Sequence, residues 1–205
     1  MRLEQPKDAL IDFDQSLLLK QTEKVLLFKA TALIKLNQVE EALKIFDSMI
    51  LEPSSSLKGY MMKGTTLFQL EKINESIEAF KKVIEIDSKS IEGYYNLAVG
   101  YEKLGKLEDS LFYYDQAIKL EPPFSDVYLN RANLLWSLGR IDESLKAINF
   151  AIEKFPKDYL GYYNKGIMLW RMKRNDEAIK SLQKSVQYNP SSKSQVKKIL
   201  SQIQV

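Results

Sequence analysis

The chain repeats a pattern every 34 residues, and this period limits its fold more than any other feature. Two series carry the period, one of tyrosines and one of prolines: Tyr60, Tyr94, Tyr128 and Tyr162, and Pro122, Pro156 and Pro190. A fixed period of this length is typical of arrays in which each structural unit stacks on its neighbours. The sequence therefore predicts an elongated array of repeats rather than one globular core.

Each period contains two amphipathic stretches, and residues 91–124 show them most clearly. The positions are Tyr94, Leu97, Ala98 and Tyr101, then Gly105, then Ser110, Tyr114 and Ala117. Large residues alternate with small ones at helical spacing, so two helices can approach each other closely. The proline at the end of the unit cannot continue the second helix. We therefore expect helix–turn–helix repeats.

The period divides the chain into five repeats and two flanking segments. The repeats are expected at 23–56, 57–90, 91–124, 125–158 and 159–192. Residues 1–22 are predicted to form a lone helix, either a cap or half of a repeat, because Ala9, Phe13 and Ser16 follow the pattern of a second helix. Residues 193–205 are predicted to form a capping helix, since their apolar residues fall on one helical face.

The amino-acid composition excludes several classes of function. The chain has no cysteine and no histidine, which removes thiolate metal sites, disulfides and the commonest general base. We therefore expect a protein that is not an enzyme and has no cofactor or metal. The 30 basic and 27 acidic residues nearly balance, so nucleic acid is not an expected partner. No apolar run is long enough to span a membrane, and we expect a cytoplasmic protein with no membrane contact.

The segment GYYNLAVGYEKLGKLEDSLFYYDQAIKLEP closely resembles the consensus of the tetratricopeptide repeat, and the resemblance extends over residues 23–192. It implies an all-α, right-handed solenoid of tandem helix–turn–helix repeats with terminal capping helices. The departures are Pro53, which lies one residue out of register, Ser88 in place of proline, and Lys173 in place of glycine. They affect turns and leave the core pattern intact.

Members of this family usually bind a peptide or a partner helix in a groove lined by the first helix of each repeat. Asn96, Asn130 and Asn164 recur at a groove position, and Asn133 lies one turn after Asn130. A side-chain amide can bond both the N–H and the C=O of a peptide backbone. The series resembles the asparagine ladder of O-linked N-acetylglucosamine transferase and of kinesin light chain. The alternative is that these amides bond only to neighbouring helices or to solvent.

The positions beside the asparagines are apolar and complete the predicted peptide-binding set. They are Met61, Tyr95, Leu129 and Tyr163, together with Phe68, Trp136 and Trp170. Large aromatic residues in a groove are typical anchors for partners, although the tryptophans could equally serve to pack adjacent helices. Three acidic residues, Glu92, Glu102 and Asp126, lead us to expect some basic residues in the partner.

These observations predict an adaptor or scaffold without catalytic activity. Its partner would be a protein or peptide, extended or helical, with apolar anchors. The alternatives are a structural subunit of a large assembly, including self-association through the ends of the array, and the targeting arm of a longer enzyme.

Overall fold

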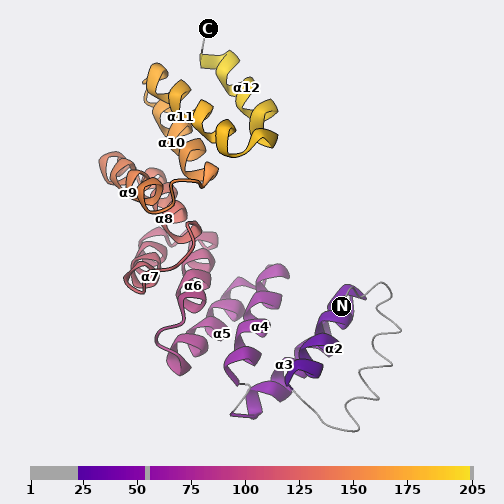
Figure 1. The fold of residues 1–205 in the computed structure, drawn as a ribbon. Helices are drawn as coiled ribbons and strands as arrows, with labels where there is room; N and C mark the ends of the chain where they lie inside the picture. The colour runs from indigo at the N-terminus through magenta and orange to yellow at the C-terminus, as the bar shows by residue number, and fades with distance from the viewer. Residues whose placement is uncertain (1–22, 54–55, 204–205) are drawn as a thin grey trace. The chain divides into compact units, whose positions relative to one another are not determined.

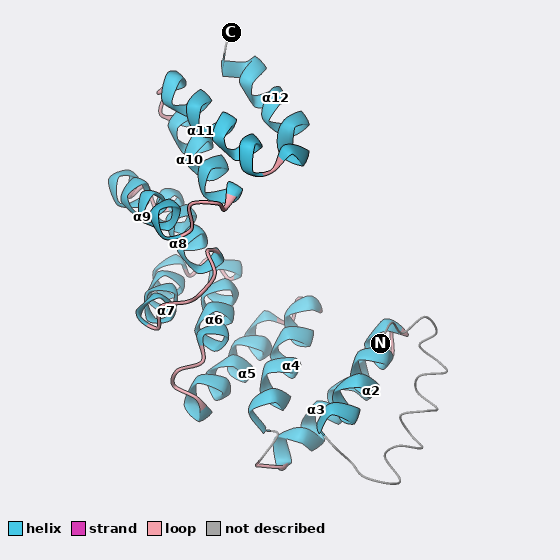
Figure 2. Cartoon of the chain, viewed as in Figure 1, coloured by secondary structure: helices cyan, strands magenta, loops and turns pink. Residues whose placement is uncertain are grey.

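The computed structural model describes residues 23–53 and 56–203, and every regular element within these ranges is a helix (Figure 2). Consecutive helices pack against each other in pairs, which confirms the predicted all-α class. None of the helices in these two ranges is long and apolar enough to cross a membrane. The helix expected in residues 1–22 lies outside the described residues. The described residues form two compact units, one that ends at Leu104 and one that begins at Gly105.

The first unit contains five described helices, each packed against the next along the chain (Figure 1). They are α2 (Glu23–Lys35), α3 (Val39–Leu51), α4 (Ser56–Gln69), α5 (Ile73–Ile86) and α6 (Ile91–Lys103). The large residues of the predicted helical faces form the core, with Phe46, Phe80 and Leu97 almost fully buried. The apolar residues that recur at helical spacing therefore form the buried face of each helix.

The second unit begins with the helix that follows Gly105 and runs to the last described residue. Its elements are α7 (Leu107–Lys119), α8 (Asp126–Ser137), α9 (Ile141–Lys154), α10 (Tyr159–Arg171), α11 (Asn175–Tyr188), the short 3-10 helix η1 (Pro190–Ser192) and α12 (Lys193–Ile203). Sequential helices pack together, and α8 also contacts α10. One core cluster lies around Ile148 and a second around Leu182.

Small residues allow the paired helices to cross closely, as the sequence predicts. A Cβ atom at Gly64 of α4 would lie 2.7 Å from the ring of Phe80 in α5. A Cβ atom at Gly166 of α10 would lie 2.7 Å from the side chain of Leu182 in α11. Both distances are shorter than ordinary carbon contacts of about 3.5–4.0 Å. The glycines therefore set the distance between the two helices of these pairs.

The turn inside each helix pair contains one residue with a positive φ angle. These residues are Asn37 (62°), Glu71 (58°), Gly105 (72°), Gly139 (74°) and Lys173 (60°), each 34 positions after the last. Glycine adopts this left-handed conformation without a steric penalty, whereas other residues pay for it. The replacement of glycine by Lys173 thus leaves the turn geometry unchanged.

Candidate functional site

A groove lies between α8 and α10 in the second unit. Its cavity has a volume of about 460 Å³ and is lined by Asn133, Trp136, Ser137, Tyr163, Asn164, Ile167, Met168, Trp170 and Arg171. Five of these residues, Asn133, Trp136, Tyr163, Asn164 and Trp170, belong to the set predicted from the sequence. The first helices of two successive pairs therefore bring predicted residues to one concave surface, because positions 34 apart face the same way.

The two tryptophans both line the groove and pack against the core. Trp136 contacts the cluster around Ile148, and Trp170 contacts the cluster around Leu182. Each indole is half-buried, so part of each ring faces the groove. Packing against the core restricts the orientation of both rings. The packing of the tryptophans against the core is thus confirmed, whereas their binding of a partner stays a prediction.

The polar side chains of the groove are Asn133, Asn164, Ser137 and Arg171, with the phenol of Tyr163 beside them. Within the described part of the chain, the side-chain amides of Asn133 and Asn164 form no hydrogen bond. The Tyr163 hydroxyl accepts a hydrogen bond from Gln195 Nε2 of α12 at 2.8 Å. The groove therefore presents two uncommitted amides beside a tyrosine whose position α12 supports.

The first unit contains four of the predicted residues, Met61, Phe68, Tyr95 and Asn96, all half-buried. Asn96 Nδ2 of α6 lies 3.5 Å from Met61 Sδ of α4, so these two positions meet on adjacent first helices. A thioether is a weak acceptor and leaves most of the hydrogen-bonding capacity of the amide unused. Asn130, in α8, is half-buried and does not line the groove described above.

Leu129 does not line the groove, contrary to the prediction from the sequence. Its side chain is only 3% exposed and lies in the core cluster of α8, α9 and α10. The residue opposite it on α10 is Gly161, where an added Cβ would lie 3.7 Å from Leu129 Cδ2. Because glycine has no side chain, Leu129 packs against the neighbouring helix instead of facing solvent. It is a core residue and cannot anchor a partner.

The charge of this groove also differs from the expectation. None of the predicted acidic residues, Glu92, Glu102 and Asp126, lines it, and among the described residues of its lining only Arg171 is charged. The sequence interpretation missed Arg171 and Ser137, although each follows a tryptophan of the recurring series directly. No group of three or more carboxylates within residues 23–53 and 56–203 is placed to hold a metal ion.

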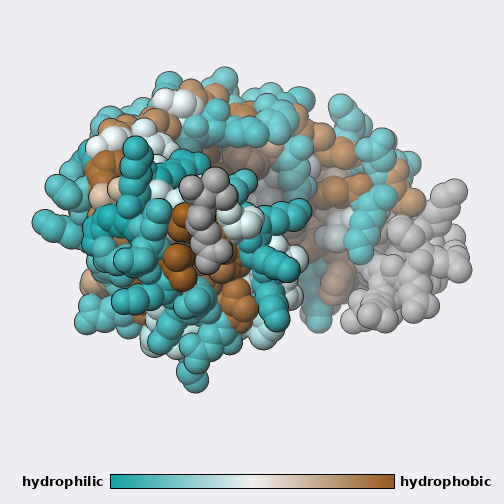
Figure 3. All heavy atoms as spheres, turned by 90° about the horizontal axis from the view of Figure 1, so that it is seen from above, coloured by the Kyte–Doolittle hydropathy of each residue, from teal (hydrophilic) through white to brown (hydrophobic). Residues whose placement is uncertain are grey.

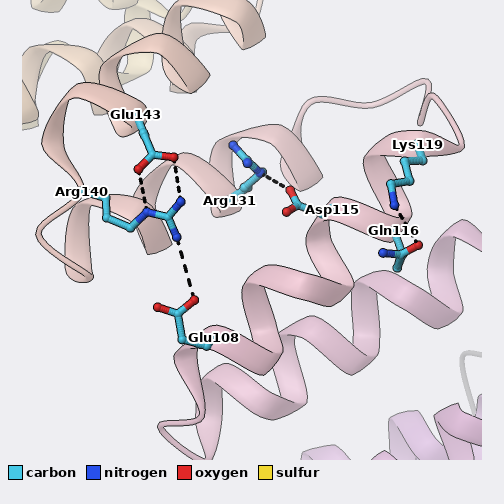
Figure 4. Close-up of polar contacts among 7 residues, drawn as sticks. All are labelled: Glu108, Asp115, Gln116, Lys119, Arg131, Arg140 and Glu143. Atoms are coloured by element: carbon cyan, nitrogen blue, oxygen red, sulfur yellow. Dashed lines mark hydrogen bonds and ion pairs between the residues drawn. The ribbon is translucent and has the colours of Figure 1, made fainter.

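A second cavity of about 460 Å³ lies among α7, α8 and α9, lined by Asp115, Ile118, Tyr128, Arg131, Glu143, Lys146, Ala147 and Phe150. Its wall includes Phe150, which is 52% exposed. No residue pattern pointed to it, because the positions equivalent to Phe150 are Gln116 and Lys184. In Figure 4, Arg131 Nε donates to the Asp115 carboxylate and so links α8 to α7.

Ion pairs form at the first turn of two second helices, α9 and α11. Arg140 donates from Nε and Nη2 to the Glu143 carboxylate at 2.7 Å each, and its Nη1 lies 3.9 Å from Glu108 (Figure 4). These hydrogen bonds lower the pKa of Glu143. Arg174 forms the same pair of bonds with Glu177, whose pKa is lowered for the same reason. The acidic residues at helix starts therefore act through local pairs as well as through the helix dipole.

Three tetratricopeptide repeat models match the sequence, at residues 64–105, 91–124 and 129–193. Together they cover more than half of the chain, and the matched regions contain α5, α9, α10 and α11 and overlap α4 and α8, the helices of three packed pairs. The chain is a tetratricopeptide repeat protein. The asparagine positions Asn96, Asn130 and Asn164 all fall within the matched residues.

Crystal structures of other tetratricopeptide repeat proteins share the fold. MamA has a TM-score of 0.70 and 19% identity, over 80% of this chain and 96% of its own. TTC0263 of Thermus thermophilus has a TM-score of 0.66 and 19% identity, over 89% and 98%. YrrB, a repeat protein described as having an unusual peptide-binding site, has a TM-score of 0.64 and 21% identity, over 87% and 92%. A comparison with curated protein sequences finds no match.

Proposed function

We propose that the chain is a protein-interaction adaptor that holds a partner peptide along the groove between α8 and α10. The observation that carries this proposal is the joint presence of two half-buried tryptophans and two uncommitted amides on one cavity of about 460 Å³. Members of the family generally mediate contacts between proteins, and the similarity in fold to the peptide-binding YrrB supports the same use here.

Each group in the groove has a distinct chemical task. The faces of Trp136 and Trp170 supply rigid apolar surface, which is the typical material of binding hot spots. The amides of Asn133 and Asn164 can each donate to a carbonyl and accept from an N–H of a peptide backbone. Arg171 can pair with a carboxylate. The partner that fits is an extended segment with an aromatic or aliphatic anchor near an acidic group.

The first test selects binding peptides from a random library displayed on phage. The affinity of an enriched, fluorescently labelled peptide is then measured by fluorescence anisotropy. Replacing Asn133 and Asn164 together with Ala should weaken binding about tenfold or more, since two backbone-directed hydrogen-bond sites are lost. The matched control replaces Asn74 and Asn149, two exposed asparagines on second helices, with Ala and should bind as the unaltered chain does. Equal affinity of all three proteins for every enriched peptide would refute the groove as the site.

The predicted asparagine ladder extends the proposal beyond this groove. It assigns Asn96 and Asn130 to further backbone contacts, so that a longer peptide would use Asn96, Asn130 and Asn164 in turn. The triple Ala variant at these positions should then lose affinity for long peptides more than for short ones. If the length of the peptide makes no difference to the loss, the site is confined to the groove of α8 and α10.

A further inference from the structure

The last part of the chain is strongly basic. Residues 178–205 contain five lysines and no Asp or Glu: Lys180, Lys184, Lys193, Lys197 and Lys198. The rest of the chain is slightly acidic, because the whole chain carries a net charge of only +3. Asp176 and Glu177 lie in the first turn of α11, and the rest of α11 together with α12 carries only positive charge, which attracts negatively charged partners.

Helix α12 occupies the place of a first helix in the repeat pattern. It begins at Lys193, 34 residues after the start of α10 at Tyr159. Its buried residues Val196 and Ile203 pack in the core cluster around Leu182 of α11. In the other described pairs of this unit, a first helix is covered by the second helix that follows it. The face of α12 that such a second helix would cover carries apolar residues.

A groove marks this face. It has a volume of about 260 Å³ and is lined by Gln183 and Val186 of α11 and by Lys193, Val196, Lys197 and Leu200 of α12. Its floor is apolar, and the described part of the chain contributes no carboxylate to its lining. Seen from above, patches of hydrophobic surface are exposed among hydrophilic side chains (Figure 3). The groove thus suits an amphipathic helix that carries acidic residues.

The sequence of this chain contains a segment with that chemistry. Within residues 8–17, DALIDFDQSL, the acidic residues Asp8 and Asp12 stand next to Ala9 and Phe13. Ala9, Phe13 and Ser16 follow the small–large–small spacing of the second helices in the repeats. The segment lies outside the described residues. Its sequence has the pattern of a second helix and a charge opposite to that of the groove.

We propose that the groove between α11 and α12 binds residues 8–17 of a second copy of the chain. Two different, complementary surfaces on one chain produce head-to-tail association, which can continue from copy to copy. Leu200 stands where Ala132 and Gly166 stand in earlier repeats, so the incoming helix lies further out than a second helix within the chain. The association is therefore weaker than packing within a repeat, and it is reversible.

Sedimentation equilibrium of the 205-residue chain tests the proposal. The average mass should rise with protein concentration over about a hundredfold range and should fall on addition of salt, since the charge pairs are screened. Replacing Lys193 and Lys197 with Glu should lower the association constant about tenfold or more, because like charges then face each other at two contacts. The control variant Lys180→Glu/Lys198→Glu has the same net charge but leaves the groove lining intact, and it should associate as the unaltered chain does.

A charge exchange makes the test specific. The association constant of the variant Asp8→Lys/Asp12→Lys by itself should fall by a similar factor. When it is mixed with the Lys193→Glu/Lys197→Glu variant, association should return, because each acidic segment again meets a basic groove and each basic segment an acidic one. A synthetic peptide of residues 4–20 should compete with this association.

Several results would overturn the proposal. If the measured mass is that of the monomer at every concentration, the proposal is wrong. It is also wrong if the mixture of the two variants fails to associate. Binding to vesicles of phosphatidylserine and phosphatidylcholine, without self-association, would assign the basic face to a lipid surface instead. The Lys193→Glu/Lys197→Glu variant should keep its affinity for peptides of the α8–α10 groove, so this test and that of the adaptor function can fail independently.

Discussion

The crossing of α4 and α5 allows a quantitative test of how small residues set the packing of a repeat. Gly64 faces Phe80, which is 2% exposed, and a Cβ at Gly64 would lie 2.7, 2.9 and 3.0 Å from three carbons of the ring. The equivalent pair in α8 and α9 is Ala132 with Ile148, both fully buried. The chain therefore contains a second solution to the same packing problem, which can be transferred to the first unit.

The magnitudes follow from these distances. The Gly64→Ala change forces the Phe80 ring to move by about 0.5–1 Å to restore ordinary contacts. Overpacking of a core costs about 1–3 kcal/mol, and the better helix propensity of Ala returns about 1 kcal/mol. We expect a net loss of about 1 kcal/mol. Phe80→Ile alone should cost about 2 kcal/mol through lost buried surface.

In the Phe80→Ile background the sign of the Gly64→Ala effect should reverse. The clash with the ring is gone, so only the gain of about 1 kcal/mol in helix propensity remains. The two changes should therefore be coupled by about 2 kcal/mol, which is within the range observed for residues in contact. Urea unfolding of the four proteins, followed by circular dichroism, measures this coupling. If the two effects are additive, the contact between Gly64 and Phe80 does not set the spacing of the helices.

Three further changes have expected outcomes. Lys173→Gly should raise the free energy of unfolding by about 1 kcal/mol in urea titrations, because glycine adopts the left-handed turn without strain; Lys173→Ala should not. Ser144→Ala should cost about 1 kcal/mol in the same assay, since Ser144 Oγ donates to the Ala132 carbonyl at 2.7 Å. Glu143 and Glu177 have lowered pKa values in the folded state, so their stabilisation is present above the unfolded pKa of about 4.3 and is lost as pH falls through the folded pKa. The double Gln variant should therefore show a flatter dependence of melting temperature on pH between about 5 and about 3, and an unchanged slope would contradict the pairing.

The repeat pattern predicted the helices because the order of large and small residues along each helix is set by which positions are buried. Leu97, Ala98 and Phe46 are buried where the period places them, and the helix breaks fall at the expected turns. The turns themselves were only partly predictable. Gly105 and Gly139 indicate a left-handed residue, but nothing local marks Glu71 for the same conformation. The packing of the flanking helices imposes that geometry, and the side chain tolerates it.

The lining of the candidate site was predictable where one position recurs on equivalent helices. Trp136 and Trp170 line the same groove because they are 34 residues apart and their helices pack side by side. Leu129 shows the limit of that inference, since its burial depends on the absence of a side chain at Gly161, 32 residues later on another helix. Exposure of a helical residue is set by the size of its neighbours in space, which periodicity does not record.

The sequence by itself determined the helix pairs, their spacing and the residues of their shared core, because these depend on a pattern local to each repeat. Only the tertiary structure decided which polar groups meet. Arg171 joins Asn133 and Asn164 in one groove, and Lys193 and Lys197 line an apolar groove next to Val186. Each groove is lined by side chains from different helices. The charge and chemistry of each groove therefore depend on which helix surfaces remain exposed after packing.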